Sequence, residues 1–120
     1  MSTAAWTPAL ITEAMTAKQK KLSEVMTFLP TVEEEYETAR RLYEMKEAEL
    51  SLKYEFDNGE RVSDAKIRAK VRTTDEYTTL WAEYIAAKSR MKKAKMEVGV
   101  LEREMRTLEE ISMSLMAEMK

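Results

Sequence analysis

The longest hydrophobic pattern in the chain is a heptad repeat that begins near residue 77 and continues to the C-terminus. Apolar residues at alternating spacings of three and four are typical of a helix that packs along another helix. The repeat predicts one helix over about residues 74–118, roughly 65 Å long at 1.5 Å per residue. We expect Thr73 and Glu76 to start it as a capping box. The predicted seam is Tyr77, Leu80, Tyr84, Ala87, Met91, Ala94, Val98, Leu101, Met105, Leu108, Ser112, Leu115 and Met119.

Two further amphipathic segments precede this repeat. Thr7 and Pro8 form an N-cap and a first helical residue, which predicts a helix over about 8–28. We expect this helix to end before Pro30, because proline disfavours the helical conformation at the residue that it follows. Thr31 and Glu34 form a second capping box and predict a helix over about 31–56. The apolar stripe expected on the first helix is Ile11, Met15, Leu22, Val25, Met26 and Leu29.

The helix expected over 31–56 carries apolar residues on two faces. One face holds Tyr36, Tyr43, Leu50 and Tyr54. At about 100° per residue, Met45, Leu52 and Phe56 lie nearly opposite this face, so one neighbouring helix cannot cover both. Either a third helix or another subunit must cover the second face. We therefore predict an all-α fold, an elongated helical hairpin with the N-terminal helix packed alongside it. We expect it to form a single domain over 1–120 and a homo-oligomer.

The connection between the helices contains the strongest turn signal. Asn58-Gly59 predicts a tight reversal, since both residues accept positive φ. The following stretch, 65–72, alternates apolar and basic residues, which is the period of a strand and would allow a hairpin with 52–56. We favour a short helix over 63–72, capped by Ser63, because alanine, lysine and arginine are good helix formers.

Composition excludes most familiar enzyme chemistry. The 120 residues include no Cys and no His, which excludes disulfides, zinc sites built on thiolate or imidazole, and imidazole bases. The chain also shows no nucleophile elbow or phosphate loop, so we expect neither an enzyme nor a cofactor or small-molecule substrate. The carboxylates near the turn (Glu55, Asp57, Glu60 and Asp64) leave open a divalent metal site, although we expect a solvated loop and no metal.

No apolar run reaches the 18 residues that a membrane span needs, and the first eight residues do not resemble a signal peptide. We therefore expect a cytoplasmic protein without a membrane partner.

The net charge of -2 conceals a segregation of charge along the chain. Residues 61–95 contain ten basic and four acidic groups, whereas residues 32–60 contain four basic and ten acidic groups. The basic region is a candidate for binding nucleic-acid phosphates. The alternative is that these basic residues form ion pairs with the acidic helix expected over 31–56, within a subunit or between subunits. The candidate nucleic-acid-binding residues are Arg61, Lys66, Arg68, Lys70, Arg72, Lys88, Arg90, Lys92 and Lys93, with Lys95 beside the last of them.

Aromatic residues gather near the start of the long helix. Tyr77, Trp81 and Tyr84 lie within three turns, close to Lys88. Aromatic rings beside basic residues can stack unpaired bases, but seam packing is the more common use of such a cluster. Trp81 lies just off the seam, so it is the aromatic side chain that we most expect to reach a ligand.

The order of these features resembles that of small helical proteins encoded beside recombination genes in tailed bacteriophages and, more distantly, UvsY-type recombination mediators. The resemblance covers about residues 35–112 and includes the basic run 66–72, Thr74-Asp75 and the segment 101–106. It implies an oligomeric protein in the host cytoplasm that binds single-stranded DNA and helps to load a recombinase past a single-strand-binding protein. Lys66, Arg68, Lys70 and Arg72 would then contact phosphates.

The alternative function is a coiled-coil adaptor, or a small inhibitor, that binds a host or phage protein. The exposed methionines expected at the C-terminal end of the chain motivate it.

Overall fold

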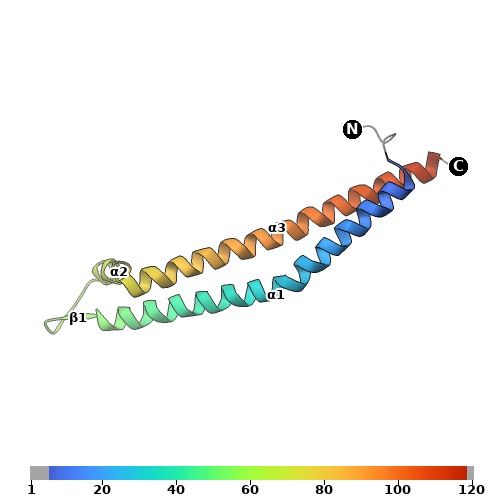
Figure 1. Ribbon diagram of the computed structural model, residues 1–120. Helices are drawn as coiled ribbons and strands as arrows, with labels where there is room; N and C mark the ends of the chain where they lie inside the picture. Colours follow the sequence, from blue (N-terminus) through green and yellow to red (C-terminus); the bar gives the residue numbers. More distant parts are fainter. Residues whose placement is uncertain (1–5, 119–120) are drawn as a thin grey trace. The chain divides into compact units, whose positions relative to one another are not determined.

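The computed structural model describes residues 6–118, which form three helices and one two-stranded hairpin (Figure 1). Helix α1 covers Pro8–Lys53, strands β1 and β2 cover Phe56–Asp57 and Glu60–Arg61, α2 covers Asp64–Arg72, and α3 covers Asp75–Glu118. The predicted all-α class is confirmed. The seam position Met119 and the first five residues lie outside the described residues. None of the described helices combines the length and the apolar character that a membrane crossing requires.

The chain folds into two compact units. The terminal unit consists of the residues up to Pro30 together with those from Lys92 onward, and the hairpin unit is Thr31–Met91. Within each unit, α1 and α3 lie side by side and run antiparallel (Figure 1). The predicted packing of the N-terminal segment alongside the long helix is confirmed in the terminal unit. There Lys18 pairs with Glu104, and the Lys21 ammonium lies 3.6 Å from a Glu97 carboxylate oxygen.

The predicted seam of α3 is confirmed. Every described seam position is buried or half-buried, including Ser112 and the two alanines. Tyr84 and Ala87 are buried in the hairpin unit, and Leu101 and Leu108 are buried in the terminal unit. The strict alternation of three- and four-residue spacings therefore identifies the buried face of α3 correctly in both units.

The predicted break at Leu29-Pro30 is wrong, because α1 continues through Pro30. Its buried and half-buried positions keep the same spacing on both sides of the proline, so Leu29 and Val32 both face inward. An internal proline removes one helical hydrogen bond and costs about 3 kcal/mol, and the burial of these flanking residues offsets that cost. Met26, which we expected in the stripe, is instead exposed. The inward positions of α1 are Ile11, Met15, Lys18, Leu22, Val25, Leu29, Val32, Tyr36, Ala39, Tyr43, Lys46 and Leu50.

The predicted reversal at Asn58-Gly59 is confirmed. Both residues have positive φ, 53° and 81°, as the favoured two-residue hairpin turn requires. Phe56 pairs with Arg61 in this hairpin, so α1 ends at Lys53 rather than near residue 56. The alternative hairpin between 65–72 and 52–56 is wrong, since residues 64–72 form α2.

The helix starts follow the predicted caps in two of four cases. The Leu10 N–H donates to Thr7 Oγ1 at 3.2 Å, and the Lys66 N–H donates to Ser63 Oγ at 3.4 Å. The box at Thr31 does not start a helix, because α1 already runs through it. The prediction that a capping box at Thr73 starts the long helix is also wrong. The hydroxyls of Thr73 and Thr74 both donate to the Lys70 carbonyl, so they close α2 instead of opening α3.

Candidate nucleic-acid interface

Helix α2 is held in the hairpin unit by two apolar residues one turn apart. Ile67 and Val71 are 8% and 3% exposed and pack in one cluster with Leu50 of α1 and Tyr77 of α3. The nine-residue helix is too short to be stable by itself in water. Its conformation and position therefore depend on this contact.

The other faces of α2 carry four exposed cations. Lys66 and Lys70 lie one turn apart on one flank, and Arg68 and Arg72 lie one turn apart on the other. None of the four forms an ion pair with any residue in the described range 6–118. Like charges at this spacing destabilise a helix by a few tenths of a kcal/mol per pair. Lys70 and Arg72 lie in the last turn, where cations stabilise a helix, but Lys66 and Arg68 do not have this advantage. Together the four residues present positive charge on both flanks of α2.

Arg61 of β2 joins this group from the hairpin. Its guanidinium lies 4.0 Å from a Glu55 carboxylate oxygen and 3.8 Å from one of Asp64, so its charge is partly compensated. Arg61, Lys66 and Lys70 line a pocket of about 460 Å³ between the hairpin and α2, together with Asp57, Asn58, Glu60, Val62 and Ser63. Within the described part of the chain, no three acidic side chains converge in a way that could hold a metal ion.

Tyr54 is a site residue that the sequence pattern did not reveal. Its half-buried ring has the Lys53 ammonium 5.6 Å and the Lys70 ammonium 5.7 Å from its centroid. Both contacts are cation–π interactions, and the ring also packs against the apolar cluster of Leu50, Ile67, Val71 and Tyr77, so Tyr54 brings the Lys53 charge next to that of Lys70. The only signal in the sequence is the adjacency of Lys53 and Tyr54, since the approach of Lys70 depends on how α2 packs.

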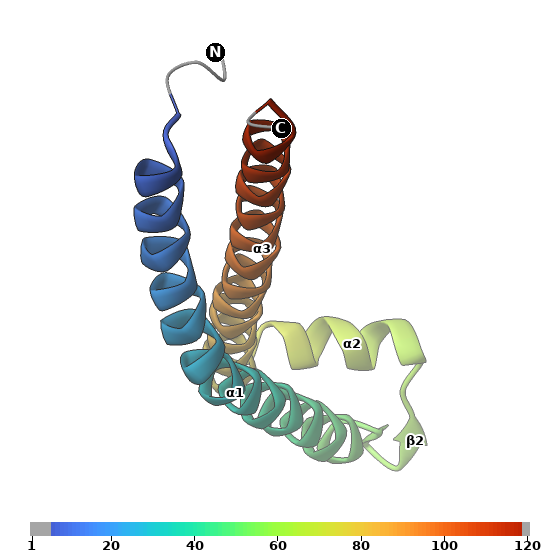
Figure 2. The ribbon, with the colours of Figure 1, turned by 90° about the vertical axis from the view of Figure 1, so that its right-hand side faces the viewer.

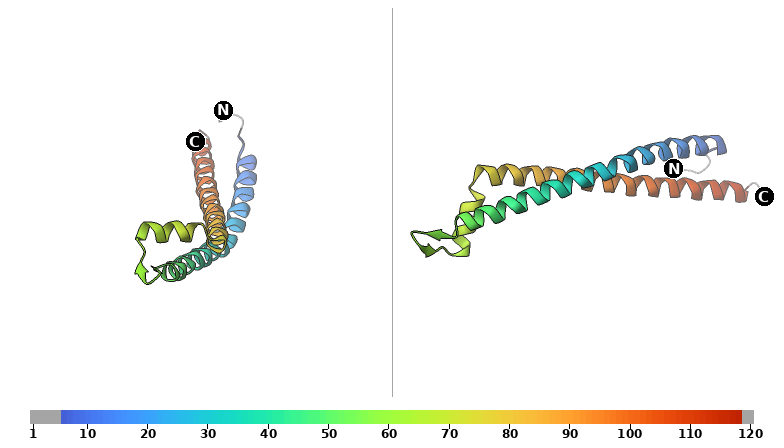
Figure 3. Two further views of the ribbon diagram at one scale, coloured as in Figure 1. Left: turned by 90° about the vertical axis from the view of Figure 1, so that its left-hand side faces the viewer. Right: turned by 90° about the horizontal axis from the view of Figure 1, so that it is seen from below.

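The second basic cluster does not join the first. Helix α2 leaves the start of α3 sideways rather than running along it (Figures 2 and 3). Lys88 is 13 residues beyond Asp75, which corresponds to about 20 Å along α3. Its ammonium lies 5.9 Å from the centroid of the Tyr84 ring. Lys92 and Lys93 are exposed and, with the adjacent Lys95, belong to the terminal unit. The continuous positive stripe that the sequence allowed is therefore not formed in the hairpin unit.

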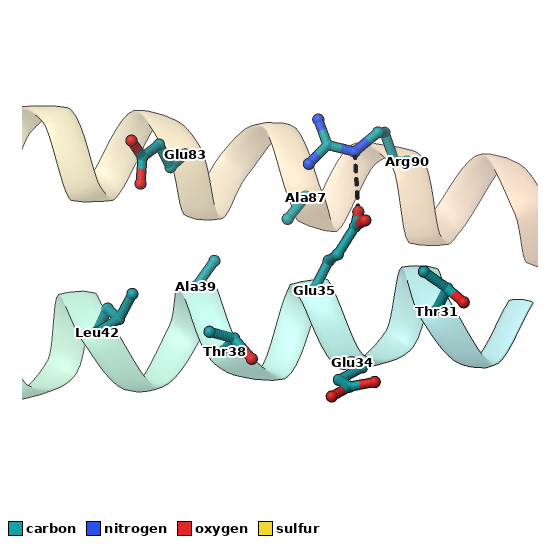
Figure 4. Close-up of a pocket in the computed structure, with 9 residues that line it drawn as sticks. All are labelled: Thr31, Glu34, Glu35, Thr38, Ala39, Leu42, Glu83, Ala87 and Arg90. Atoms are coloured by element: carbon teal, nitrogen blue, oxygen red, sulfur yellow. Dashed lines mark ion pairs between the residues drawn. The ribbon is translucent and has the colours of Figure 1, made fainter.

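Arg90 fits the alternative interpretation, in which basic residues form ion pairs with the acidic helix. Its guanidinium lies 3.8 Å from a Glu35 carboxylate oxygen across a groove between α1 and α3 (Figure 4). Ala39 and Ala87 line the same groove of about 430 Å³, and Glu34 and Glu83 add negative charge to its lining. This groove is unsuited to phosphate, and we remove Arg90 from the candidate interface.

The aromatic cluster is used for packing between the helices. Tyr77 and Tyr84 are buried, and the Trp81 ring lies 5.2 Å from Tyr43, 5.5 Å from Tyr84 and 6.3 Å from Tyr77 between centroids. Such pairs add stability beyond the apolar area that they bury. Trp81 remains 40% exposed at the edge of the cluster, yet these three neighbouring rings already hold it in place.

This packing shifts the ionisation of three tyrosines. A hydrogen bond with Tyr84 raises the pKa of Tyr36, and burial raises the pKa of Tyr43 and of Tyr77. In each case the folded protein favours the neutral phenol over the phenolate. The stability that results is present below the ordinary tyrosine pKa of 10.0 and is lost as the pH rises above it.

We therefore expect this contribution to the free energy of unfolding to be retained from neutrality to about pH 10 and to be lost as the pH rises above 10.0, through the raised pKa values of the folded protein. Denaturant unfolding followed by circular dichroism over this range measures the effect, and tyrosinate absorbance reports the ionisation. Tyr43→Phe should flatten the dependence, because phenylalanine has no proton to lose. A slope that is the same in Tyr43→Phe and in the parent protein would contradict the role of this tyrosine.

Comparisons of the chain with protein-family models, with curated proteins and with solved structures find no match.

Proposed function

We propose that the protein is a non-catalytic cytoplasmic protein that binds single-stranded DNA through α2 and acts as an accessory factor in phage-type recombination. The observation that carries the proposal is the set of four exposed basic side chains on α2 without an ion-pair partner among the described residues. Lys53, which lies over the same Tyr54 ring as Lys70, adds a further cation beside α2. The resemblance to phage recombination proteins adds a recombinase and a single-strand-binding protein as further partners.

A titration of labelled single-stranded oligonucleotide at several salt concentrations tests the proposal. Four phosphate contacts predict a slope of about -3 in the logarithm of the binding constant against that of the salt concentration, since each contact on a single strand contributes about -0.7. Affinity should then fall about 50-fold between about 50 and 200 mM salt. Lys66→Ala, Arg68→Ala, Lys70→Ala and Arg72→Ala, combined in one variant, should remove most of the affinity and the slope.

A matched control separates this interface from the general charge of the protein. Lys20, Lys21, Arg103 and Arg106 are four exposed basic residues of the terminal unit, and changing all four to alanine alters the net charge by the same amount. Binding should persist in this control. No binding at low salt, or an equal loss in both variants, would contradict the proposal.

The second candidate is a helical adaptor or inhibitor that binds a host or phage protein. It is favoured by the large exposed apolar side chains of the terminal unit, which are Leu10, Met26, Phe28, Met96, Val100, Met113 and Met116. Such side chains, methionine above all, are typical of surfaces that bind partner proteins. A stable complex with a lysate protein, together with the absence of DNA binding at low salt, would favour this candidate over the first.

A further inference from the structure

The buried face of α2 fixes the direction in which its other residues point. Ile67 and Val71 are 8% and 3% exposed and lie in the cluster that α2 shares with α1 and α3. At about 100° per residue, the positions opposite to them are those of Ala65 and Ala69, which are both exposed. The outer face of α2 is therefore a low ridge without charge.

The four cations of α2 form two rows, one on each flank of this ridge. Lys66 and Lys70 make up the lysine row, and Arg68 and Arg72 make up the arginine row. None of the four has an ion-pair partner within residues 6–118. A row of cations along each side of a helix is complementary to two phosphate backbones, as a duplex presents them on either side of its major groove.

The dimensions of α2 suit this groove. A helix with its side chains is about 10–12 Å across, and the major groove of B-form DNA is about 12 Å wide and about 8.5 Å deep. The nine residues of α2 extend over about 14 Å. The helix projects sideways from the start of α3, and neither α1 nor α3 runs along its length (Figures 2 and 3).

The lysine row borders the pocket between the hairpin and α2, which leaves space for a backbone on that flank. Arg61, Lys66 and Lys70 line the pocket together with the carboxylates of Asp57 and Glu60, so three cations face two anions. The balance of charge on this flank therefore stays positive, as binding to a phosphate backbone requires.

We propose that α2 also binds double-stranded DNA, by lying in the major groove with the lysine row on one backbone and the arginine row on the other. The proposal rests on the proposed function, because the same four cations contact phosphate in both. A flexible single strand can reach both rows by crossing α2, whereas a duplex reaches both only when the ridge enters its groove. The two alanines of the ridge cannot hydrogen-bond a base edge, so they read no sequence.

Bulk on the ridge tests this arrangement without changing any charge. Ala65→Leu combined with Ala69→Leu places good helix formers at two exposed positions, and hydrogen exchange of residues 64–72 checks that α2 stays folded. The leucines hold the rows away from the backbones, so affinity for a labelled duplex oligonucleotide should fall about tenfold or more. Affinity for a single strand of the same length should change less than about threefold, because that strand adapts to the surface.

The matched control makes the same change on another helix. Ala82 and Ala86 are two exposed alanines with the same spacing on α3, and changing both to leucine should leave both affinities unchanged. Equal losses of duplex affinity in this control and in the ridge variant would overturn the proposal. Equal losses for duplex and single strand in the ridge variant would overturn it too.

The salt dependence of duplex binding tests the two rows separately. Four contacts predict a slope of about -3.6 in the logarithm of the binding constant against that of the salt concentration, since each contact on a duplex contributes about -0.9. Lys66→Gln with Lys70→Gln, and Arg68→Gln with Arg72→Gln, should each reduce the slope to about -1.8. A slope that changes in only one of the two variants would contradict the contact with two backbones.

The parent protein separates this proposal from the proposed function. Binding to the single strand but not to the duplex would overturn the duplex proposal and leave the proposed function intact. Binding to the duplex alone would support the duplex proposal and contradict the single-strand function. Failure to bind either oligonucleotide at low salt would overturn both.

Discussion

Leu50→Ala is expected to lower the free energy of unfolding of the hairpin unit by about 3 kcal/mol. Leu50 is 4% exposed and lies in the cluster with Ile67, Val71 and Tyr77, so this cluster joins all three helices of the unit. Removing its isopropyl group leaves a cavity that α2, with only two buried residues, cannot fill. Small domains are stable by about 5–15 kcal/mol, so a loss of this size is a large fraction of the total.

Leu52→Ala is the matched control, since it makes the same chemical change two residues away on a side chain that is 72% exposed. Its effect should be within about 0.5 kcal/mol. Denaturant unfolding followed by circular dichroism measures both variants, at protein concentrations low enough that self-association does not contribute. Hydrogen exchange should show faster opening of residues 64–72 in Leu50→Ala. Equal effects of the two substitutions would contradict the central place of Leu50 in the cluster.

The sequence predicted the long helix well because one property, the alternation of three- and four-residue spacings, determines its buried face. The same alternation exists in α1, but Lys18 and Lys46 occupy two of its inward positions and conceal it. Both lysines extend their charged ends to carboxylates, Lys18 to Glu104 and Lys46 to Glu49 and Glu76. A long side chain can cover apolar surface while its charge stays paired, and a pattern of apolar and polar residue types does not capture this.

The basic run 66–72 was identified as the candidate site from the sequence, and α2 confirms that it is a short capped helix. Its separation from Lys88 could not be predicted, because that depends on the direction in which α2 leaves α3. Ile67 and Val71 fix this direction by packing on Leu50 and Tyr77. The place of Tyr54 beside Lys70 follows from the same contact. Local pattern thus predicts which charges are present, whereas tertiary packing decides which of them meet.

The continuity of α1 through Pro30 leads to the second large effect. A proline inside a helix has no N–H to donate to the carbonyl four residues earlier, here that of Met26, and its ring crowds that carbonyl. Alanine restores the hydrogen bond and is the best helix former, a difference of about 3 kcal/mol. Proline also restricts the unfolded chain, which offsets up to about 1 kcal/mol of this gain. Pro30→Ala is therefore expected to stabilise the protein by about 2 kcal/mol.

Pro8→Ala is the natural control, because these are the only two prolines in the chain and Pro8 is the first residue of α1. At that position the missing N–H has no helical partner and the fixed φ suits the helix, so the substitution should be neutral or slightly destabilising. Thermal and denaturant unfolding of both variants measure the difference. If Pro30→Ala unfolds at a lower denaturant concentration than the parent protein, proline stabilises the backbone at this position better than alanine does, and the expected stabilisation is contradicted. If it unfolds at a higher concentration, the packing of the flanking Leu29 and Val32 is what keeps α1 continuous against the preference of its own sequence.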